Sequence, residues 1–196
     1  IKAVDRHADL LRMSTACVGN DLRLGADEAP PAIVSIFLGD QLQDVVRQIV
    51  ETGTAADCIA GSQLNTGVST LPLIRQDATD RNRTSPFAFT GNKFEFRMLG
   101  SSASISGANV VINTAVAESL RQYADALEGS TDFENDLHEL IRSVIRKHKR
   151  IIFSGNGYGD EWVREAEKRG LLNLPTTPDC VPHYLAMKNV ELFARH

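Results

Sequence analysis

The strongest constraint on the fold is a β-hairpin pattern between residues 85 and 98. Residues 85–89 and 93–98 alternate in polarity around a three-residue connection, 90–92, which contains Gly91. A period of two is typical of half-buried strands, and a glycine in a short connection permits the positive φ that many hairpins need. The second strand has two faces, Lys93, Glu95 and Arg97 on one and Phe94, Phe96 and Met98 on the other. The pattern predicts a hairpin whose aromatic face packs on a core and whose charged face turns away from it.

The charged face admits two interpretations. The ordinary one is a half-exposed strand with solvated charges. However, the first strand carries no charges for cross-strand pairing, so the row would face outward without partners. Four more charged residues precede the hairpin: Asp77, Asp80, Arg81 and Arg83. A carboxylate flanked by cations suits a divalent metal beside phosphate oxygens, and Arg and Lys both bind phosphate or carboxylate groups. The spacing therefore favours an anion or phosphate site.

Helical periodicity dominates the rest of the chain. Apolar residues recur at helical spacing in five segments: 1–16, 41–51, 108–128, 133–145 and 161–169. Glycines 53, 129 and 170 stand where helices would end, and Asp160 stands where an N-cap would. Residues 32–38 are typical of a short buried strand. The Gly-rich segment 154–159 lacks the spacing of a dinucleotide-binding motif, so we expect a loop that precedes a helix. The pattern predicts an α+β chain, mainly helical after residue 108.

Composition narrows the class of protein. A chain of 196 residues is long enough for one domain with a core, and its net charge of −4 disfavours nucleic acid as a partner. The apolar runs are far shorter than the roughly 20 residues that cross a bilayer, and no signal peptide is visible. Three scattered cysteines suit reduced thiols. We expect a cytoplasmic protein that binds neither membrane nor nucleic acid. The first residue, Ile1, lies in the middle of an amphipathic stretch, which suggests a piece of something longer.

Several stretches resemble the glutamine synthetase family. Residues 80–97, DRNRTSPFAFTGNKFEFR, are similar to the phosphate- and metal-binding hairpin of the type III branch. Residues 23–31, RLGADEAPP, resemble the active-site flap loop of that family, whose core is Glu-Ala-Pro. Residues 157–162 and 169–174 resemble the type III C-terminal region more loosely. The resemblance therefore spans most of the chain.

The resemblance implies a place within a larger catalytic domain. Residues 1–196 would be its C-terminal portion, with the active-site flap and hairpin in 1–100 and a helical region in 101–196. The implied fold is a curved antiparallel sheet with helices outside, and the implied assembly is a homo-oligomeric ring, by resemblance a dodecamer, with active sites between subunits. The implied reaction is the ATP-dependent ligation of ammonia to L-glutamate through γ-glutamyl phosphate, with Mg²⁺ or Mn²⁺ bound.

Residue roles follow from the same resemblance. Glu95 would bind the metal that bridges the ATP phosphates, and Arg23 and Arg97 would hold the substrate glutamate. Arg83 would contact ATP and stabilise the phosphoryl group in transfer. Glu28 would close over the site, help to accept the ammonium proton and shield the intermediate from water.

Three features depart from the family pattern. Lys93 stands where the commoner enzymes carry an Arg that contacts a nucleotide phosphate, so a point charge replaces a forked donor. Asp27 and Leu22 stand where the type III loop usually has Asn before Glu28 and His before Arg23. The spacing from Arg23 to Glu28 is also one residue shorter than in the commoner enzymes.

Two other functions remain open. One is a γ-glutamyl-amine ligase of the same superfamily, which the loop sequences disfavour. The other is a non-catalytic fragment or remnant that serves oligomerisation or regulation. It is supported because Glu95 is the one carboxylate at a recognisable ligand position and the family's Glu-x-Glu strand, Asn loop and N-terminal domain are not found. We expect these 196 residues alone to be inactive.

Overall fold

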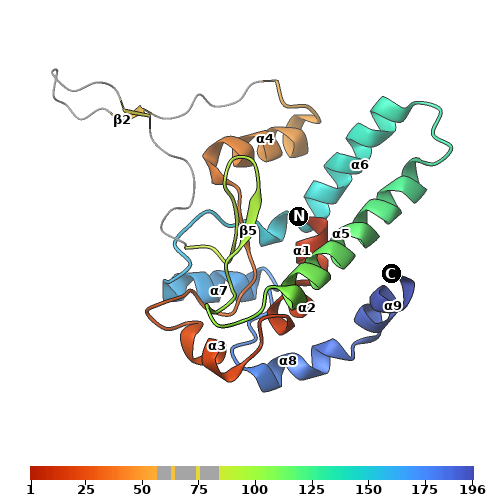
Figure 1. Ribbon diagram of the computed structural model, residues 1–196. Coiled ribbons are helices and arrows are strands. Elements are labelled where there is room, and N and C mark those ends of the chain that lie inside the picture. Colours follow the sequence, from red (N-terminus) through yellow and green to blue (C-terminus); the bar gives the residue numbers. More distant parts are fainter. Residues whose placement is uncertain (57–62, 65–73, 76–83) are drawn as a thin grey trace.

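Helices make up most of the structure, a computed structural model that describes residues 1–56, 63–64, 74–75 and 84–196 (Figure 1). In chain order the elements are α1 (Lys2–Arg6), α2 (Ala8–Met13), α3 (Val18–Arg23), β1 (Ile36–Phe37), α4 (Gly39–Thr52), β2 (Gln63–Leu64), β3 (Ile74–Arg75), β4 (Phe87–Phe89), β5 (Phe94–Phe96), α5 (Ser106–Leu127), α6 (Phe133–His148), the 3₁₀-helix η1 (Lys149–Ile151), α7 (Asp160–Lys168), α8 (Thr177–Tyr184) and α9 (Met187–Arg195). The predicted α+β class and the helical second half are confirmed. Among the described helices, none combines the length and apolar character that crossing a membrane requires.

The predicted hairpin is formed by β4 and β5. The two strands pair antiparallel, and the backbone N–H of Thr90 donates to the carbonyl of Lys93 at 2.9 Å across the connection. Gly91 has φ +97°, a conformation that a side chain would strain. The local sequence pattern therefore predicted this element correctly.

The resemblance implied an antiparallel sheet, but the three-stranded sheet of the structure is mixed. The short strand β1 pairs in parallel with β4, while β2 and β3 form a separate antiparallel pair. Parallel neighbours need a long crossover connection, and the connection from β1 to β4 includes the helix α4. Only Ile36–Phe37 of the predicted strand 32–38 is in this sheet, although residues 32–34 are also buried.

The main core lies between the sheet and the helices of both halves of the chain. Five of its side chains are at most 1% exposed: Leu10, Leu11, Ile36, Met98 and Ile151. Full burial of each such side chain contributes about 1.5–3 kcal/mol relative to exposure. The aromatic face of β5 joins this core only in part. Phe96 is partly buried against it, but Phe94 lies near the turn and is 48% exposed.

Helix ends follow the predicted signals with two exceptions. Gly53, Gly129 and Gly170 all have positive φ just after helices, and the Asp132 carboxylate accepts from the backbone N–H of Asn135 at the start of α6. The predicted N-cap Asp160 is instead the first residue of α7, because the extended Gly159 takes the cap position. The predicted helix 1–16 is broken at His7, whose buried ring faces Asn189 of α9.

Candidate functional site

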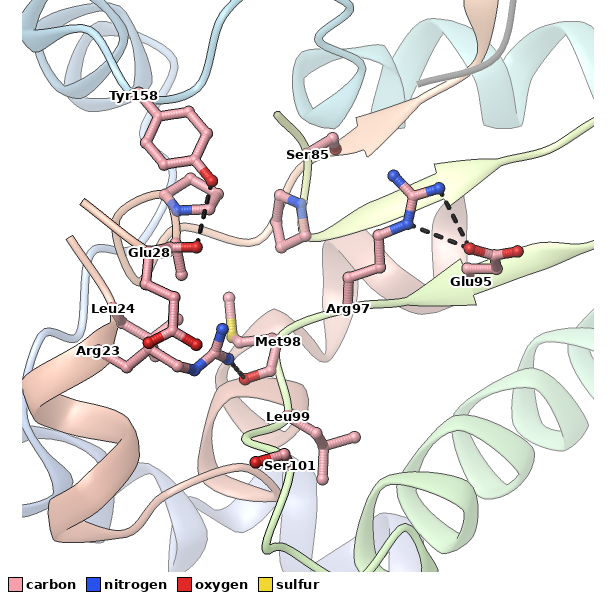
Figure 2. Close-up of a pocket in the computed structure, with 13 residues that line it drawn as sticks. Arg23, Leu24, Glu28, Ser85, Glu95, Arg97, Met98, Leu99, Ser101 and Tyr158 are labelled. Carbon is pink, nitrogen blue, oxygen red and sulfur yellow. Dashed lines mark hydrogen bonds and ion pairs between the residues drawn. The ribbon is translucent and has the colours of Figure 1, made fainter. Parts of the chain in front are cut away.

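A pocket of about 390 Å³ lies where α3, the loop after it, the hairpin and the loop before α7 meet (Figure 2). Its lining includes Arg23, Glu28, Glu95 and Arg97, four of the six residues predicted from the sequence to form a site. Lys93 is close to Glu95 but does not line the pocket, and Arg83 lies outside the described residues. The fold therefore brings together the predicted flap and the charged face of β5.

Arg23 is the last residue of α3 and is held by the polypeptide on two sides. Its Nε donates to the side-chain oxygen of Asn20 at 3.0 Å, and its Nη2 donates to the carbonyl of Met98 at 2.8 Å. The amide of the buried Asn20 also donates to the Met98 carbonyl, at 2.9 Å, and to the Thr15 carbonyl, at 2.8 Å. These bonds fix the direction of the Arg23 guanidinium at the edge of the pocket.

The charged face of β5 forms its own ion pairs. Arg97 donates from Nε and Nη2 to the same oxygen of Glu95, at 3.2 and 3.1 Å, and Lys93 Nζ lies 3.6 Å from the other oxygen. The expectation of an unpartnered row was therefore wrong, because long side chains two positions apart on one strand face can reach each other. Hydrogen bonding by Arg97 lowers the pKa of Glu95, so this group is a carboxylate at neutral pH. Arg97 is the most buried of the three, with 17% of its side chain exposed.

Glu28 lies in a tight loop after α3, residues 24–29, which we call the flap loop. The N–H of Gly25 donates to the carbonyls of Ala29 and Pro30, both at 3.1 Å, and Gly25 has φ +82°. The Glu28 side chain is exposed, and Figure 2 shows its carboxylate turned to the side of the pocket where Arg23 lies. The flap loop thus presents a carboxylate beside a guanidinium.

Sequence reasoning did not identify Tyr158 as a residue of this site. Tyr158 lines the pocket, and its hydroxyl donates to the backbone carbonyl of Glu28 at 3.3 Å (Figure 2). The stretch 157–162 drew attention through its resemblance, but no local pattern shows that a tyrosine 130 positions away will reach the flap loop.

Glu95 is the one predicted metal ligand among the residues that line this pocket. Magnesium prefers an octahedral set of oxygen ligands, and Glu95 supplies one carboxylate that already accepts from Arg97. Within the described ranges, no group of three or more His, Cys, Asp or Glu side chains is placed to hold a metal ion. The carboxylates Asp77 and Asp80 lie outside those ranges. The described residues therefore do not form a metal site by themselves.

Comparisons with known proteins agree on one family. Residues 136–196 match the family model described as the glutamine synthetase C-terminal domain. The type-3 glutamine synthetase of Dictyostelium discoideum is 45% identical over 197 residues, which cover 99% of this chain and 27% of that protein. The glutamine synthetase of Butyrivibrio fibrisolvens is 44% identical, covering 100% of this chain and 28% of the relative. That of Bacteroides fragilis is 42% identical, covering 92% and 26%. The chain thus spans about a quarter of the length of these curated relatives.

Proposed function

Because this chain is a homologue of the type III glutamine synthetases, we propose that it supplies one wall of the active site of a glutamate–ammonia ligase. In that reaction ATP phosphorylates the γ-carboxylate of glutamate, and ammonia then displaces phosphate from γ-glutamyl phosphate. The observation that carries the proposal is the pocket itself. Two arginines and two glutamates from the flap region and the hairpin line one cavity, although more than 60 positions separate Glu28 from Glu95.

Glutamate binding is assigned to Arg23 and Arg97. A guanidinium matches a carboxylate with two parallel hydrogen bonds, and such charge-assisted bonds are about twice as strong as neutral ones. Asn20 and the Met98 carbonyl orient Arg23, and Glu95 orients Arg97, so both side chains are held before substrate arrives. Preorganised donors cost little rearrangement during the reaction.

Glu28 is assigned to the ammonia side of the reaction. Its carboxylate can accept a proton from ammonium, and its exposed position on the flap loop allows it to cover the intermediate. Water that reached γ-glutamyl phosphate would return glutamate and phosphate, so the flap loop has to exclude it during turnover. Asp27 adds a second negative charge next to Glu28, which favours approach of the ammonium cation.

The nucleotide side is assigned to Lys93, Arg83 and Glu95. Lys93 is 66% exposed and can extend to a phosphate group, and Glu95 is proposed as one ligand of the Mg²⁺ or Mn²⁺ ion bound with ATP. The remaining metal ligands would come from other parts of a longer enzyme. The partner subunits of a ring would be further copies of that enzyme. This division fits a chain that matches about a quarter of its relatives' length.

The proposal is tested in the protein expressed from the complete reading frame that encodes these residues. We expect glutamate- and ammonium-dependent release of ADP, with one glutamine formed per ADP. Arg97→Ala should lower kcat/KM for glutamate about 10- to 100-fold, the effect of losing a charged hydrogen-bonding partner. The backbone of β5 should stay in place, because the N–H of Arg97 donates to the Pro86 carbonyl independently of the side chain.

A matched control is Arg164→Ala, which removes an exposed arginine on α7 outside the pocket. It should leave kcat/KM for glutamate within about twofold of the unaltered protein. Absence of glutamine formation, or an Arg97→Ala protein indistinguishable from Arg164→Ala, would contradict the proposal.

A further inference from the structure

The loop before α7, residues 154–159, packs against Pro30, directly after the flap loop, and against Thr84, directly before the hairpin segment. A Cβ atom on Gly157 would overlap the carbonyl oxygen of Thr84 and lie 3.4 Å from Cβ of Pro30. Glycine is therefore required at this position for so close an approach of two backbones. The C-terminal half of the chain thus touches both elements that form the pocket.

Both ends of this loop are held by the core. At its start, the N–H of Phe153 donates to the Ile36 carbonyl at 2.9 Å, which joins it to the sheet. The Phe153 ring stacks on Trp162 of α7 with a centroid distance of 3.8 Å and an interplanar angle of 14°. Trp162 is 3% exposed and packs with Ile33, shortly after the flap loop in the chain. Loop 154–159 is thus a fixed support.

Tyr158 is the residue of this support that reaches the flap loop. The side chain of Asn156 accepts a hydrogen bond from the Tyr158 N–H at 3.0 Å, which orders the turn that presents the ring. The hydroxyl then donates to the carbonyl of Glu28 at 3.3 Å. Figure 2 shows the ring next to Glu28, with its hydroxyl turned toward the Glu28 backbone.

We propose that Tyr158 is a positioning residue that latches the flap loop and thereby fixes the Glu28 carboxylate over the pocket. Residues 25–28 are exposed, and the flap loop is closed internally by the bonds of Gly25. The acceptor belongs to Glu28 itself, so a displacement of this carbonyl also moves the carboxylate. The latch itself is argued from the hydrogen bond between Tyr158 and Glu28. Its effect on the exclusion of water from the intermediate rests on the proposed function.

The latch is tested by hydrogen exchange in the protein expressed from the complete reading frame. Tyr158→Phe keeps the ring and removes only the donor. We expect the backbone amides of residues 24–29 to exchange about two- to tenfold faster, the factor that the loss of one net hydrogen bond produces. Tyr184→Phe is the control, because it makes the same chemical change at an exposed tyrosine of α8 outside the pocket. It should leave this exchange unchanged.

The consequence for the reaction is tested by product stoichiometry. In the unaltered protein, one ADP should appear per glutamine. In Tyr158→Phe, water should compete with ammonia for γ-glutamyl phosphate, so that ADP exceeds glutamine and the excess grows as ammonium is lowered. The KM for glutamate should change less than about twofold, since Arg23 and Arg97 are untouched. A residue that merely stabilised the fold would lower both products equally.

Each result decides a separate part of the inference. Unchanged exchange in residues 24–29 of Tyr158→Phe overturns the latch. Faster exchange with an unchanged ratio of ADP to glutamine overturns the role in excluding water. If the unaltered protein makes no glutamine, the proposed function fails, and the exchange measurement still accepts or rejects the latch.

Discussion

At the scale of single residues, the amide of Asn20 joins α3 to the end of the hairpin. Asn20 is 2% exposed and donates to the carbonyls of Thr15 and Met98. Asn20→Asp keeps the shape but replaces the donor with an oxygen that faces two carbonyl oxygens. We expect the free energy of unfolding to fall by about 1–3 kcal/mol, the cost of unsatisfied buried polar groups. Urea unfolding followed by the fluorescence of Trp162, the chain's single tryptophan, measures it.

The control for this substitution is Asn109→Asp. Asn109 is exposed in the first turn of α5, where a negative charge is neutral or slightly favourable. A loss of stability in Asn20→Asp no larger than in Asn109→Asp would show that the Asn20 amide does not hold the two segments together.

At the scale of elements, one carboxylate ties the C-terminal helix α9 to α5. Glu118 of α5 is 4% exposed and accepts hydrogen bonds from Arg121, Gln122, Arg195 and His196. Hydrogen bonding by Arg121, followed by the contributions of His196 and Gln122, holds the pKa of Glu118 far below the ordinary value of 4.5. The unfolded chain therefore binds this proton at a higher pH than the folded chain. The resulting stabilisation is fully present above the unfolded value and is lost as the pH falls below it.

Acid should accordingly weaken the docking of α9. Between about pH 5 and pH 3 we expect the midpoint of thermal unfolding to fall less steeply in Glu118→Gln than in the unaltered chain, because this variant has no proton to bind at that position. At neutral pH the variant should be the less stable of the two. Glu128→Gln, at an exposed residue just after α5, provides the comparison. Equal pH dependence in all three proteins would contradict the role given to Glu118.

Elements specified by nearby residues could be predicted, and those specified by distant residues could not. Gly91 lies in the connection of the hairpin and Gly53 directly follows α4, so both signals are local, and the hairpin and the end of α4 were predicted with them. The break between α1 and α2 lies at His7, whose ring faces a residue 182 positions later, and no local periodicity contains that partner. The parallel pairing of β1 likewise depends on where the chain returns after α4.

At the scale of the whole molecule, motif resemblance identified pocket residues without showing how they are held. Arg23, Glu28, Glu95 and Arg97 were found from the flap and hairpin patterns. The anchoring of Arg23 on the Met98 carbonyl was not predictable, because a backbone acceptor leaves no mark in the sequence. The division of the chain at residue 100 stays a prediction. The pocket does not follow that division, since Ser101 and Tyr158 line it together with the flap loop.

The 196-residue chain alone should therefore be catalytically inactive. It spans 26–28% of the length of the relatives that it matches, and its described part contains no cluster of three or more His, Cys, Asp or Glu side chains placed to hold a metal ion. Phosphoryl transfer from ATP depends on positioned metal ions that neutralise the developing charge, so arginines alone would leave most of the barrier in place. Isothermal titration with ATP and Mg²⁺ should detect no tight binding, and coupled assays should detect no ADP. ADP release by this chain that requires both glutamate and ammonium would show instead that one wall of the site is sufficient.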